Sequence, residues 1–464
     1  MIAARPDPGS FRDPGGRVFI AGDRVLRAVM EANAPAYRVA RDAGLYDSLV
    51  RQGLLLPARE RPADELLDHA DGVVHALEHP RIPFVSYPYE WSFAAHRQAA
   101  LLHLDLHLAA LEAGFTLSDA TAYNVQFRGT RPIFIDHLSL RPYRDGELWT
   151  GHRQFCMQFL NPLLFWTLLK VPPNAWFRGH LEGIAPEEIA PLLPLRGKLS
   201  WTVLSHVVAQ ASLQRRAIGR RHASSRLRTA RLPRQAFLGL LRGLRDYIAR
   251  LTPPGGRTVW GDYAMANGYS AEEAAAKRAF VQEMVEAARP PLLFDLGCNS
   301  GDYSEAALDA GAANVVGFDY DHAALDRAFD RFRRTDRSFL PLWLDAANPS
   351  PSQGWAQRER QGLSERSRAD ALIALAFIHH IVIGRNVPLG MALDWLTGLA
   401  PIGIIEFPPK SDPMVRRLLA LRDDVFPDYT EAAFIKVLSA RARIVRSRHL
   451  SENGRLLVWY DRTS

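Results

Sequence analysis

The most informative segment of the chain is residues 292–321, which read LLFDLGCNSGDYSEAALDAGAANVVGFDYD. An apolar run ends at Asp295, and a tight turn that contains Gly297 and Gly301 follows it. An alanine-rich helical pattern and a second apolar run then lead to Asp319. Strand, glycine turn, helix and strand in this order predict one βαβ unit of a parallel sheet.

The two glycines have a physical role in such a turn. Because they lack a Cβ atom, Gly297 and Gly301 let the backbone adopt a positive φ and let its amides approach a ligand. Asp319, after the second strand, is placed to accept hydrogen bonds from ribose hydroxyls, as in nucleotide-binding folds. The alternative is an ordinary glycine-rich turn of an α/β protein. A third apolar stretch that ends at Asp345 favours the nucleotide-binding interpretation.

The spacing of the turn is D-x-G-x-x-x-G, which differs from the dinucleotide fingerprint G-x-G-x-x-G. It resembles the first motif of class I S-adenosylmethionine (SAM) methyltransferases, so the resemblance implies SAM as the cofactor. In that family the glycine turn wraps the methionine and ribose parts of SAM. The resemblance assigns cofactor binding to the loop residues Asp295, Gly297, Cys298, Asn299 and Gly301, to Asp319 at the ribose, and to Asp345 near the adenine.

Strand and helix patterns alternate from this segment to the end of the chain. Further strands are expected at 339–344, 371–377 and 402–407, and a final hairpin pair at 443–447 and 455–460. This order matches the seven-stranded, Rossmann-like α/β sheet of class I methyltransferases. The resemblance covers roughly residues 259–461.

Candidate catalytic side chains follow the fourth and fifth strands. His379 and His380 come after the fourth strand, and Glu406 ends the fifth. Ligands of open α/β sheets bind at the carboxyl ends of the strands, so these side chains are expected beside the methyl acceptor. A histidine is suited to take the acceptor's O–H or N–H proton near neutral pH. The alternatives are that the histidines pack against the sheet and that Glu406 bonds a backbone amide, and the sequence does not choose between the two histidines.

A second motif lies in the first half of the chain, at residues 116–140. Asp119, Asn124 and Asp136 resemble the catalytic segment of protein kinases and aminoglycoside-type phosphotransferases, in which the first Asp orients the acceptor and the other two residues hold Mg²⁺. The resemblance implies an α+β kinase-like domain. The His-Arg-Asp and Asp-Phe-Gly signatures are absent, and no lysine precedes Lys170, so a vestigial nucleotide site is expected. Alternatively, these side chains only satisfy the backbone of a turn.

Length and composition predict a globular protein of two or three domains. The chain has 464 residues, of which 47% are hydrophobic and 23% charged, so it is not a disordered chain. The expected divisions are a disordered N-terminus at 1–16, a kinase-like domain at 17–250, a linker at 251–257 and a methyltransferase domain at 258–464. This combination resembles bacterial proteins, including a nodulation-associated group, in which a degenerate kinase-like region precedes a SAM methyltransferase.

The positive charge of the chain is local. The pI is about 9.5, but the excess is concentrated in an arginine cluster at 215–234, and no acidic residue occurs between Pro191 and Arg245. The cluster is interpreted as a solvated face, or as a surface for a phosphate-rich partner or an anionic membrane. Aromatic residues do not alternate with these arginines, so a nucleic-acid partner is possible but not favoured.

The chain carries no sign of secretion or of metal-binding motifs. Its two cysteines, Cys156 and Cys298, lie far apart in the sequence, so free thiols and no metal site are expected. No signal-peptide pattern opens the chain, and its longest apolar run is too short to span a bilayer. A cytoplasmic protein is therefore expected.

Together these patterns predict a SAM-dependent methyltransferase that modifies an O or N atom of a small molecule or a saccharide. The N-terminal domain would then bind the acceptor or regulate the enzyme. Two alternatives remain open: a bifunctional kinase-like and methyltransferase protein, and a non-catalytic SAM-binding scaffold that docks an anionic partner through the arginine cluster.

Overall fold

The fold was analysed in a computed structural model, which describes residues 4–66, 71–212, 231–253, 270–420, 422–450 and 454–463. The chain divides into two compact units. The first unit consists of residues 1–127, 131–255 and 353–360, and the second of residues 128–130, 256–352 and 361–464. The units divide after residue 255, and the short segments 128–130 and 353–360 each belong to the other unit than the residues that flank them.

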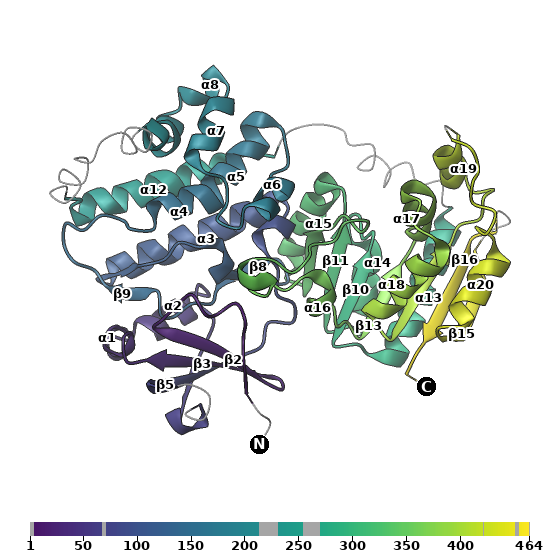
Figure 1. The fold of residues 1–464 in the computed structure, drawn as a ribbon, viewed down its shortest axis with the longest axis horizontal. Helices are drawn as coiled ribbons and strands as arrows, with labels where there is room; N and C mark the ends of the chain where they lie inside the picture. The colour runs from purple at the N-terminus through teal and green to yellow at the C-terminus, as the bar shows by residue number, and fades with distance from the viewer. Residues whose placement is uncertain are drawn as a thin grey trace. The chain divides into compact units, whose positions relative to one another are not determined.

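The first unit begins with an antiparallel sheet (Figure 1). The strands lie in the order β1-β2-β3-β5-β4, and their bounds are β1 Arg5–Pro6, β2 Gly16–Ala21, β3 Arg24–Met30, β4 Arg59–Arg61 and β5 Val73–His79. Strands β2 and β3 form a hairpin. The expectation of a disordered N-terminus is wrong for residues 4–16, because β1 pairs with β2 and Ala4 is buried in the core of this sheet.

Two short helices, α1 (Ala34–Asp42) and α2 (Leu45–Arg51), lie between β3 and β4. Gly44 separates them with a φ of 68°, a conformation that few other residues adopt at low cost. The next helix is α3 (Phe93–Glu112), and the Ser92 hydroxyl caps its N-terminus by accepting a hydrogen bond from Ala95 N.

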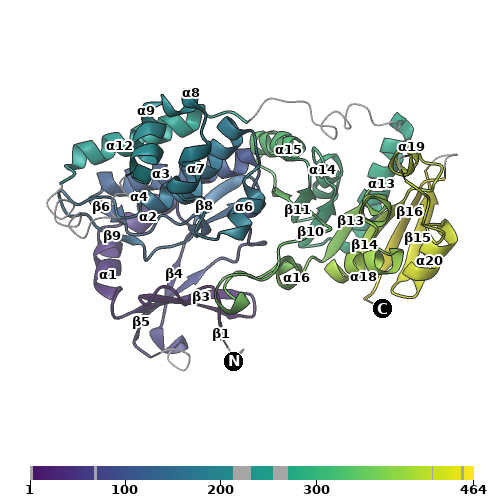
Figure 2. The ribbon, with the colours of Figure 1, turned by 45° about the horizontal axis from the view of Figure 1, so that its top comes forward.

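The rest of the first unit is mainly helical in its described residues (Figure 2). Short strands come first: β6 Phe115–Leu117, β7 Val125–Arg128, β8 Arg131–Phe134 and β9 Leu140–Pro142, with the 3₁₀ turn η3 Ala122–Asn124 before β7. The helices follow: α4 His152–Phe155, η4 Cys156–Leu160, α5 Asn161–Leu164, η5 Phe165–Leu169, α6 Asn174–Gly179, α7 Pro186–Leu192, α8 Leu195–Lys198, α9 Trp201–Val203, η6 Leu204–Val208 and α12 Arg234–Arg250. The segments η4, η5 and η6 are π-helical turns within longer helical runs.

The second unit contains the predicted seven-stranded α/β sheet, in the order β12-β11-β10-β13-β14-β16-β15. The strands are β10 Leu292–Leu296, β11 Asn314–Asp319, β12 Phe339–Trp343, β13 Ala371–Ala374, β14 Ile402–Phe407, β15 Arg443–His449 and β16 Leu456–Asp461. The first five are parallel, and β16 pairs antiparallel with β14 and β15, which confirms the final hairpin at the sheet edge.

Helices lie against this sheet. They are α13 Ala271–Ala288, α14 Asp302–Asp309, α15 His322–Thr335, α16 Leu363–Arg366, α17 Ile378–Arg385, α18 Leu389–Leu399, α19 Pro413–Leu419 and α20 Glu431–Ser439. Buried side chains of α13, α14 and α15 form one apolar core with the strands. Figure 2 shows these three helices on one side of the strands and α18 on the other.

Candidate functional site

The candidate site lies where the strand order of the second unit reverses. Strand β10 pairs with β11 on one side and with β13 on the other, and all three run parallel. In open α/β sheets, ligands generally bind at such a point, in the crevice between the loops that leave the carboxyl ends of the two strands. The predicted cofactor residues and the two candidate histidines follow these strands.

The turn after β10 is held by backbone hydrogen bonds to β11. The amides of Gly297 and Cys298 both donate to the Phe318 carbonyl, at 2.8 and 3.1 Å. Gly297 has a φ of 79° and Gly301 a φ of 84°, so both glycines adopt the conformation for which they were singled out. A Cβ at Gly301 would lie 2.7 Å from the Phe332 ring, which also requires glycine there.

The Asp319 carboxylate is fixed against this turn. One oxygen accepts a hydrogen bond from Asn299 N at 2.8 Å, and the other accepts from Asp321 N at 2.8 Å. Burial raises the pKa of Asp319 to about 6, although these backbone amides lower it. The carboxylate is therefore already oriented, and each oxygen keeps further capacity to accept a hydrogen bond from a ligand.

Asp295 and Cys298 face the interior. The Asp295 carboxyl is buried and accepts a 2.6 Å hydrogen bond from the Ser304 hydroxyl, and burial raises its pKa to about 7. The Cys298 side chain belongs to the apolar core, and burial raises its pKa. Only the backbone of Cys298 is available to a ligand in the crevice. In contrast to the Cys298 thiol, the side-chain oxygen of Asn299 is a buried polar atom that accepts no hydrogen bond from the protein.

Aromatic residues lie at the carboxyl ends of β11 and β12. Tyr320 follows Asp319 and is 54% exposed, and its carbonyl accepts a hydrogen bond from the Trp343 indole at 3.1 Å. The guanidinium of Arg385 lies 5.9 Å from the Tyr320 ring and 3.7 Å from the Asp345 carboxylate. Asp345 thus lies on the same side of the crevice as Tyr320, in agreement with its expected place after the third strand.

The two candidate histidines begin a helix, α17, which the sequence did not predict. Their rings lie 4.0 Å apart. His379 is fully buried and neither ring nitrogen has a protein partner, whereas His380 is partly exposed. Burial lowers the pKa of His380 to about 4 and lowers that of His379 as well, so both imidazoles are neutral near pH 7. A neutral imidazole has a lone pair that can accept a proton.

Glu406 lies in a buried network of charges. It is 0% exposed and pairs with Lys277 of α13 at 2.8 Å and with Arg455 at 3.0 Å. Arg455 also pairs with Asp412 at 2.6 Å. Burial alone would raise the pKa of Glu406, but the charges of Lys277 and Arg455 outweigh it and lower the pKa. These partners occupy the carboxylate, so Glu406 is not placed to receive a proton from an acceptor.

The same carboxylate fixes the turn that leads to the histidines. Glu406 accepts a hydrogen bond from Ala376 N at 2.7 Å, and Ala376 has a φ of 49° although it is not glycine. Backbone strain of this kind persists only where the surroundings hold it, and it is common at functional sites. Glu406 therefore bonds a backbone amide, as the alternative interpretation of the sequence expected, and it sets the start of α17.

In the first unit, Asn124 forms hydrogen bonds with both Asp119 and Asp136. The Asn124 amide donates to Asp119 at 3.2 Å and to Asp136 at 3.3 Å. Burial, followed by the nearby Asp136 charge, raises the pKa of Asp119. Asp136 also forms an ion pair with Arg27 of β3. Arg27 was not predicted, because the resemblance implies a lysine at this position and an arginine is a poor substitute for its compact charge.

Most of the arginine cluster, 215–230, lies outside the described residues. Arg234 is described, and it donates to the carbonyls of Leu111 and Glu112 at the C-terminus of α3. This arginine thus adds hydrogen bonds at the end of the helix, where the Leu111 carbonyl also accepts one from Gly114 N.

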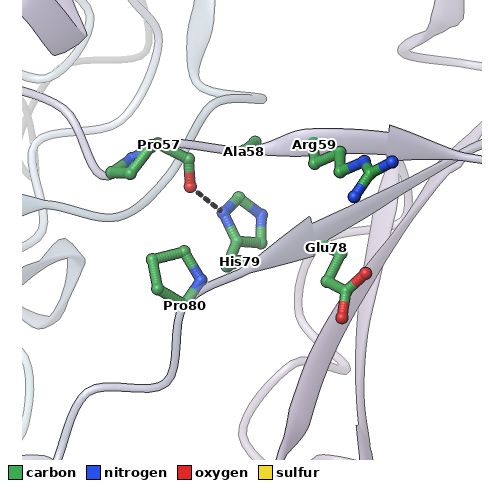
Figure 3. Close-up of a pocket in the computed structure, with 6 residues that line it drawn as sticks. All are labelled: Pro57, Ala58, Arg59, Glu78, His79 and Pro80. Carbon is green, nitrogen blue, oxygen red and sulfur yellow. Dashed lines mark hydrogen bonds between the residues drawn. The ribbon is translucent and has the colours of Figure 1, made fainter.

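A pocket of about 390 Å³ opens in the first unit, between the end of β5 and the chain before β4 (Figure 3). His79 points into it and is 3.3 Å from the Pro57 carbonyl. None of the predicted site residues lines this pocket. No described helix is both long and apolar enough to cross a membrane.

Several residues of the candidate site escaped sequence analysis. Tyr320 could have been found as an aromatic residue directly after the ribose-binding acid. Arg455 and Asp412 could not be found in this way. Arg455 contacts Glu406 and Asp412 only in the folded protein.

The chain is similar to known proteins in sequence and in structure. No family model matches it. Among solved structures, similarity is found to the N-methyltransferase NodS from Bradyrhizobium japonicum WM9 (12% identity, 42% of this chain and 99% of that one, TM-score 0.31). WbdD is similar over 47% of both chains, with 15% identity and a TM-score of 0.32. At these scores the structural likenesses assign no activity.

A sequence relative covers the whole chain. The nodulation protein NoeA of Rhizobium meliloti (strain 1021) is 45% identical over 469 aligned residues, which comprise 100% of this chain and 98% of NoeA. Identity of this level over the full length extends through both units. The chain belongs to the family of the nodulation protein NoeA.

Proposed function

We propose that the protein is a SAM-dependent methyltransferase, with SAM held by the turn after β10 and by Asp319. The observation that carries this proposal is the Asp319 carboxylate, which two backbone amides orient at the mouth of the crevice. The unpartnered oxygen of Asn299 adds an acceptor that suits the ammonium group of the methionine part. Tyr320 and Asp345 then lie on the side expected for the adenine.

When bound, SAM supplies a methyl group on an electrophilic sulfonium. The residues of this chain would hold the cofactor, orient the acceptor and receive one proton. We assign the proton to His380, because its ring is partly exposed and its low pKa keeps it neutral. His379 lies behind it, and Glu406 acts as a positioning residue through Ala376. An O–H or N–H group of a small molecule or a saccharide is the proposed acceptor.

Asp319→Ala is expected to weaken SAM binding by roughly 10- to 150-fold. A hydrogen bond to a charged group contributes about 1.5–3 kcal/mol, and about 1.4 kcal/mol corresponds to a tenfold change in Kd. Calorimetric titration with SAM measures the effect. Asp330→Ala is the matched control, since Asp330 is exposed on α15. Equal SAM affinity in the Asp319 and Asp330 variants contradicts the proposed ribose site.

The second candidate is a kinase-like nucleotide site in the first unit that has lost Mg²⁺–ATP binding. The convergence of Asp119, Asn124 and Asp136 supports it, and Arg27 on β3 supplies a cation in place of the absent lysine. Arg27 neutralises Asp136, which disfavours a metal ion there, so the proposed site is vestigial. The first unit would then serve acceptor binding or regulation.

Calorimetric titration with Mg²⁺–ATP distinguishes a vestigial site from a bifunctional enzyme. A vestigial site is expected to give no calorimetric signal with Mg²⁺–ATP in the full-length protein, because the Arg27–Asp136 pair competes with the metal. Binding that is lost in Asp136→Ala and retained in Asp145→Ala, an acidic residue of the β9–α4 loop, supports the bifunctional alternative instead.

A further inference from the structure

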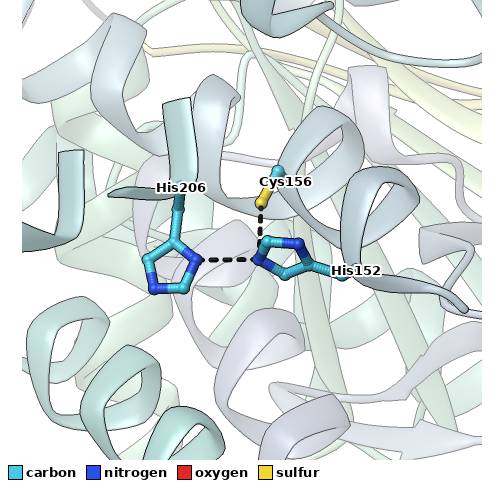
Figure 4. Close-up of side chains that lie close together, drawn as sticks. All are labelled: His152, Cys156 and His206. Atoms are coloured by element: carbon cyan, nitrogen blue, oxygen red, sulfur yellow. Dashed lines mark hydrogen bonds between the residues drawn. The ribbon is translucent and has the colours of Figure 1, made fainter. Parts of the chain in front are cut away.

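A cluster of three metal-ligating side chains lies in the helical part of the first unit, apart from the residues of the proposed function. It consists of His152, Cys156 and His206 (Figure 4). One ligand atom from each lies within 4.8 Å of the other two. No other such group of His, Cys or acidic side chains occurs in the described parts of the chain.

The cluster is built from two helical segments that each contribute residues four positions apart. His152 begins α4 and Cys156 follows one turn later, so their side chains share a face of the helix. His206 lies in η6, and Gln210 follows it at the same spacing. Cys156 starts a π-helical turn and His206 lies within another, and such turns are frequent at functional sites.

The distances suit a tetrahedral ion. Zinc binds nitrogen at about 2.0–2.1 Å and sulfur at about 2.3 Å, which places ligand atoms of a tetrahedral site roughly 3.3–3.6 Å apart. The Cys156 sulfur lies 3.7 Å from His152 Nε2. His206 Nδ1 lies 2.7 Å from the same Nε2, the distance of a hydrogen bond, so an ion requires these two rings to separate by roughly 0.6 Å.

Gln210 completes the environment of His152. Its amide nitrogen lies 2.6 Å from His152 Nδ1, while its own oxygen is buried without a partner. With the amide turned over, that oxygen accepts the Nδ1 proton that a metal-bound Nε2 requires. Such an outer hydrogen bond orients most metal-binding histidines.

We propose that His152, Cys156 and His206 bind a zinc ion, with Gln210 as the positioning residue for His152. A thiolate with two imidazoles is a ligand set that favours zinc among the common divalent ions. His152 and His206 are each partly exposed, so an ion can enter from solvent and a water can fill the fourth position. The two helical segments lie about fifty residues apart along the chain, and the ion links them.

The test is metal analysis of the untagged full-length protein with zinc as the probe. The wild type is expected to hold about one zinc per chain after dialysis, whereas Cys156→Ser and His206→Gln hold almost none. His180→Gln, at an exposed histidine of the same unit, is the control and is expected to match the wild type. Gln210→Ala is expected to weaken zinc binding by about 10- to 100-fold, and Gln210→Glu, which keeps an acceptor at Nδ1, to restore it.

Substitution with cobalt gives a second, spectroscopic readout, and the spectrum of the wild type tests the thiolate ligand without any variant. Cobalt-loaded wild type is expected to show a thiolate-to-cobalt charge-transfer band, which Cys156→Ser removes and His180→Gln keeps. The proposal is overturned if the wild type retains no more zinc than His206→Gln. It is equally overturned if the cobalt form lacks that band or keeps it in Cys156→Ser, since Cys298 would then be the thiolate.

Discussion

Lys277→Met is expected to destabilise the second unit by roughly 3–5 kcal/mol, because it leaves a buried carboxylate short of one partner. Lys277 is 1% exposed and pairs with Glu406, which is 0% exposed. Arg455 and Asp412 continue the network, so its four charges sum to zero in the native protein. Removal of one cation breaks this balance where water cannot compensate. The midpoint and slope of urea unfolding measure the loss.

A surface ion pair on the same helix provides the matched control for this effect. Glu283 of α13 pairs with Arg446 at 2.5 Å, but both side chains are more than one-third exposed. Glu283→Gln is expected to cost less than about 1 kcal/mol. Lys277→Met combined with Glu406→Gln is expected to cost less than the two single changes added together, because neither partner is then left charged alone. If Lys277→Met costs no more than Glu283→Gln, the network does not stabilise the unit.

His380→Ala is expected to lower the methyl-transfer rate by about 100- to 10,000-fold, the usual contribution of a general base. SAM affinity should stay unchanged, since His380 follows β13 and the proposed cofactor residues follow β10 and β11. The rate is measured as transfer of isotope-labelled methyl groups into a pool of metabolites and glycans from cell lysate. Because burial lowers the pKa of His380 to about 4, the rate should not fall between pH 8 and about pH 6 through protonation of this ring.

Two further variants test whether the loss of methyl-transfer rate is specific to His380. His449→Ala changes an exposed histidine of β15 in the same unit and should leave the rate unchanged. Glu406→Gln should lower the rate through the Ala376 turn and also destabilise the unit, whereas His380→Ala should affect the rate alone. A His380 variant with the wild-type rate would remove the proposed base.

The cofactor side of the candidate site could be predicted from sequence because it is local. Gly297, Gly301 and Asp319 lie within one βαβ unit. The apolar strands and the glycines of this unit follow one another in a single segment of the sequence. Their backbone angles and hydrogen bonds follow from that order. The hairpin of β15 and β16 at the sheet edge could be predicted for a similar reason, because two strands that follow each other in the sequence commonly pair antiparallel.

The charged network and the metal cluster could not be predicted, because their members meet only in the folded chain. Lys277 and Glu406 are 129 residues apart, and His152 and His206 are 54 apart. Periodicity assigned Glu406 to the end of a strand but did not reveal that two buried cations would occupy it. Arg27, which is 109 residues from Asp136, was missed for the same reason, although Asp136 itself was predicted. Local order therefore predicts turns and strands, whereas pairing of buried charges requires the packing of distant elements.

The central claim is that the turn after β10 binds SAM, and calorimetric titration of the full-length protein with SAM tests it most directly. The wild type is expected to bind one SAM per chain. Gly297→Arg should abolish binding, because the native φ of 79° disfavours any side chain and the arginine would fill the exposed mouth of the turn. Absence of binding to the wild type, or undiminished binding to a folded Gly297→Arg variant, would contradict the account.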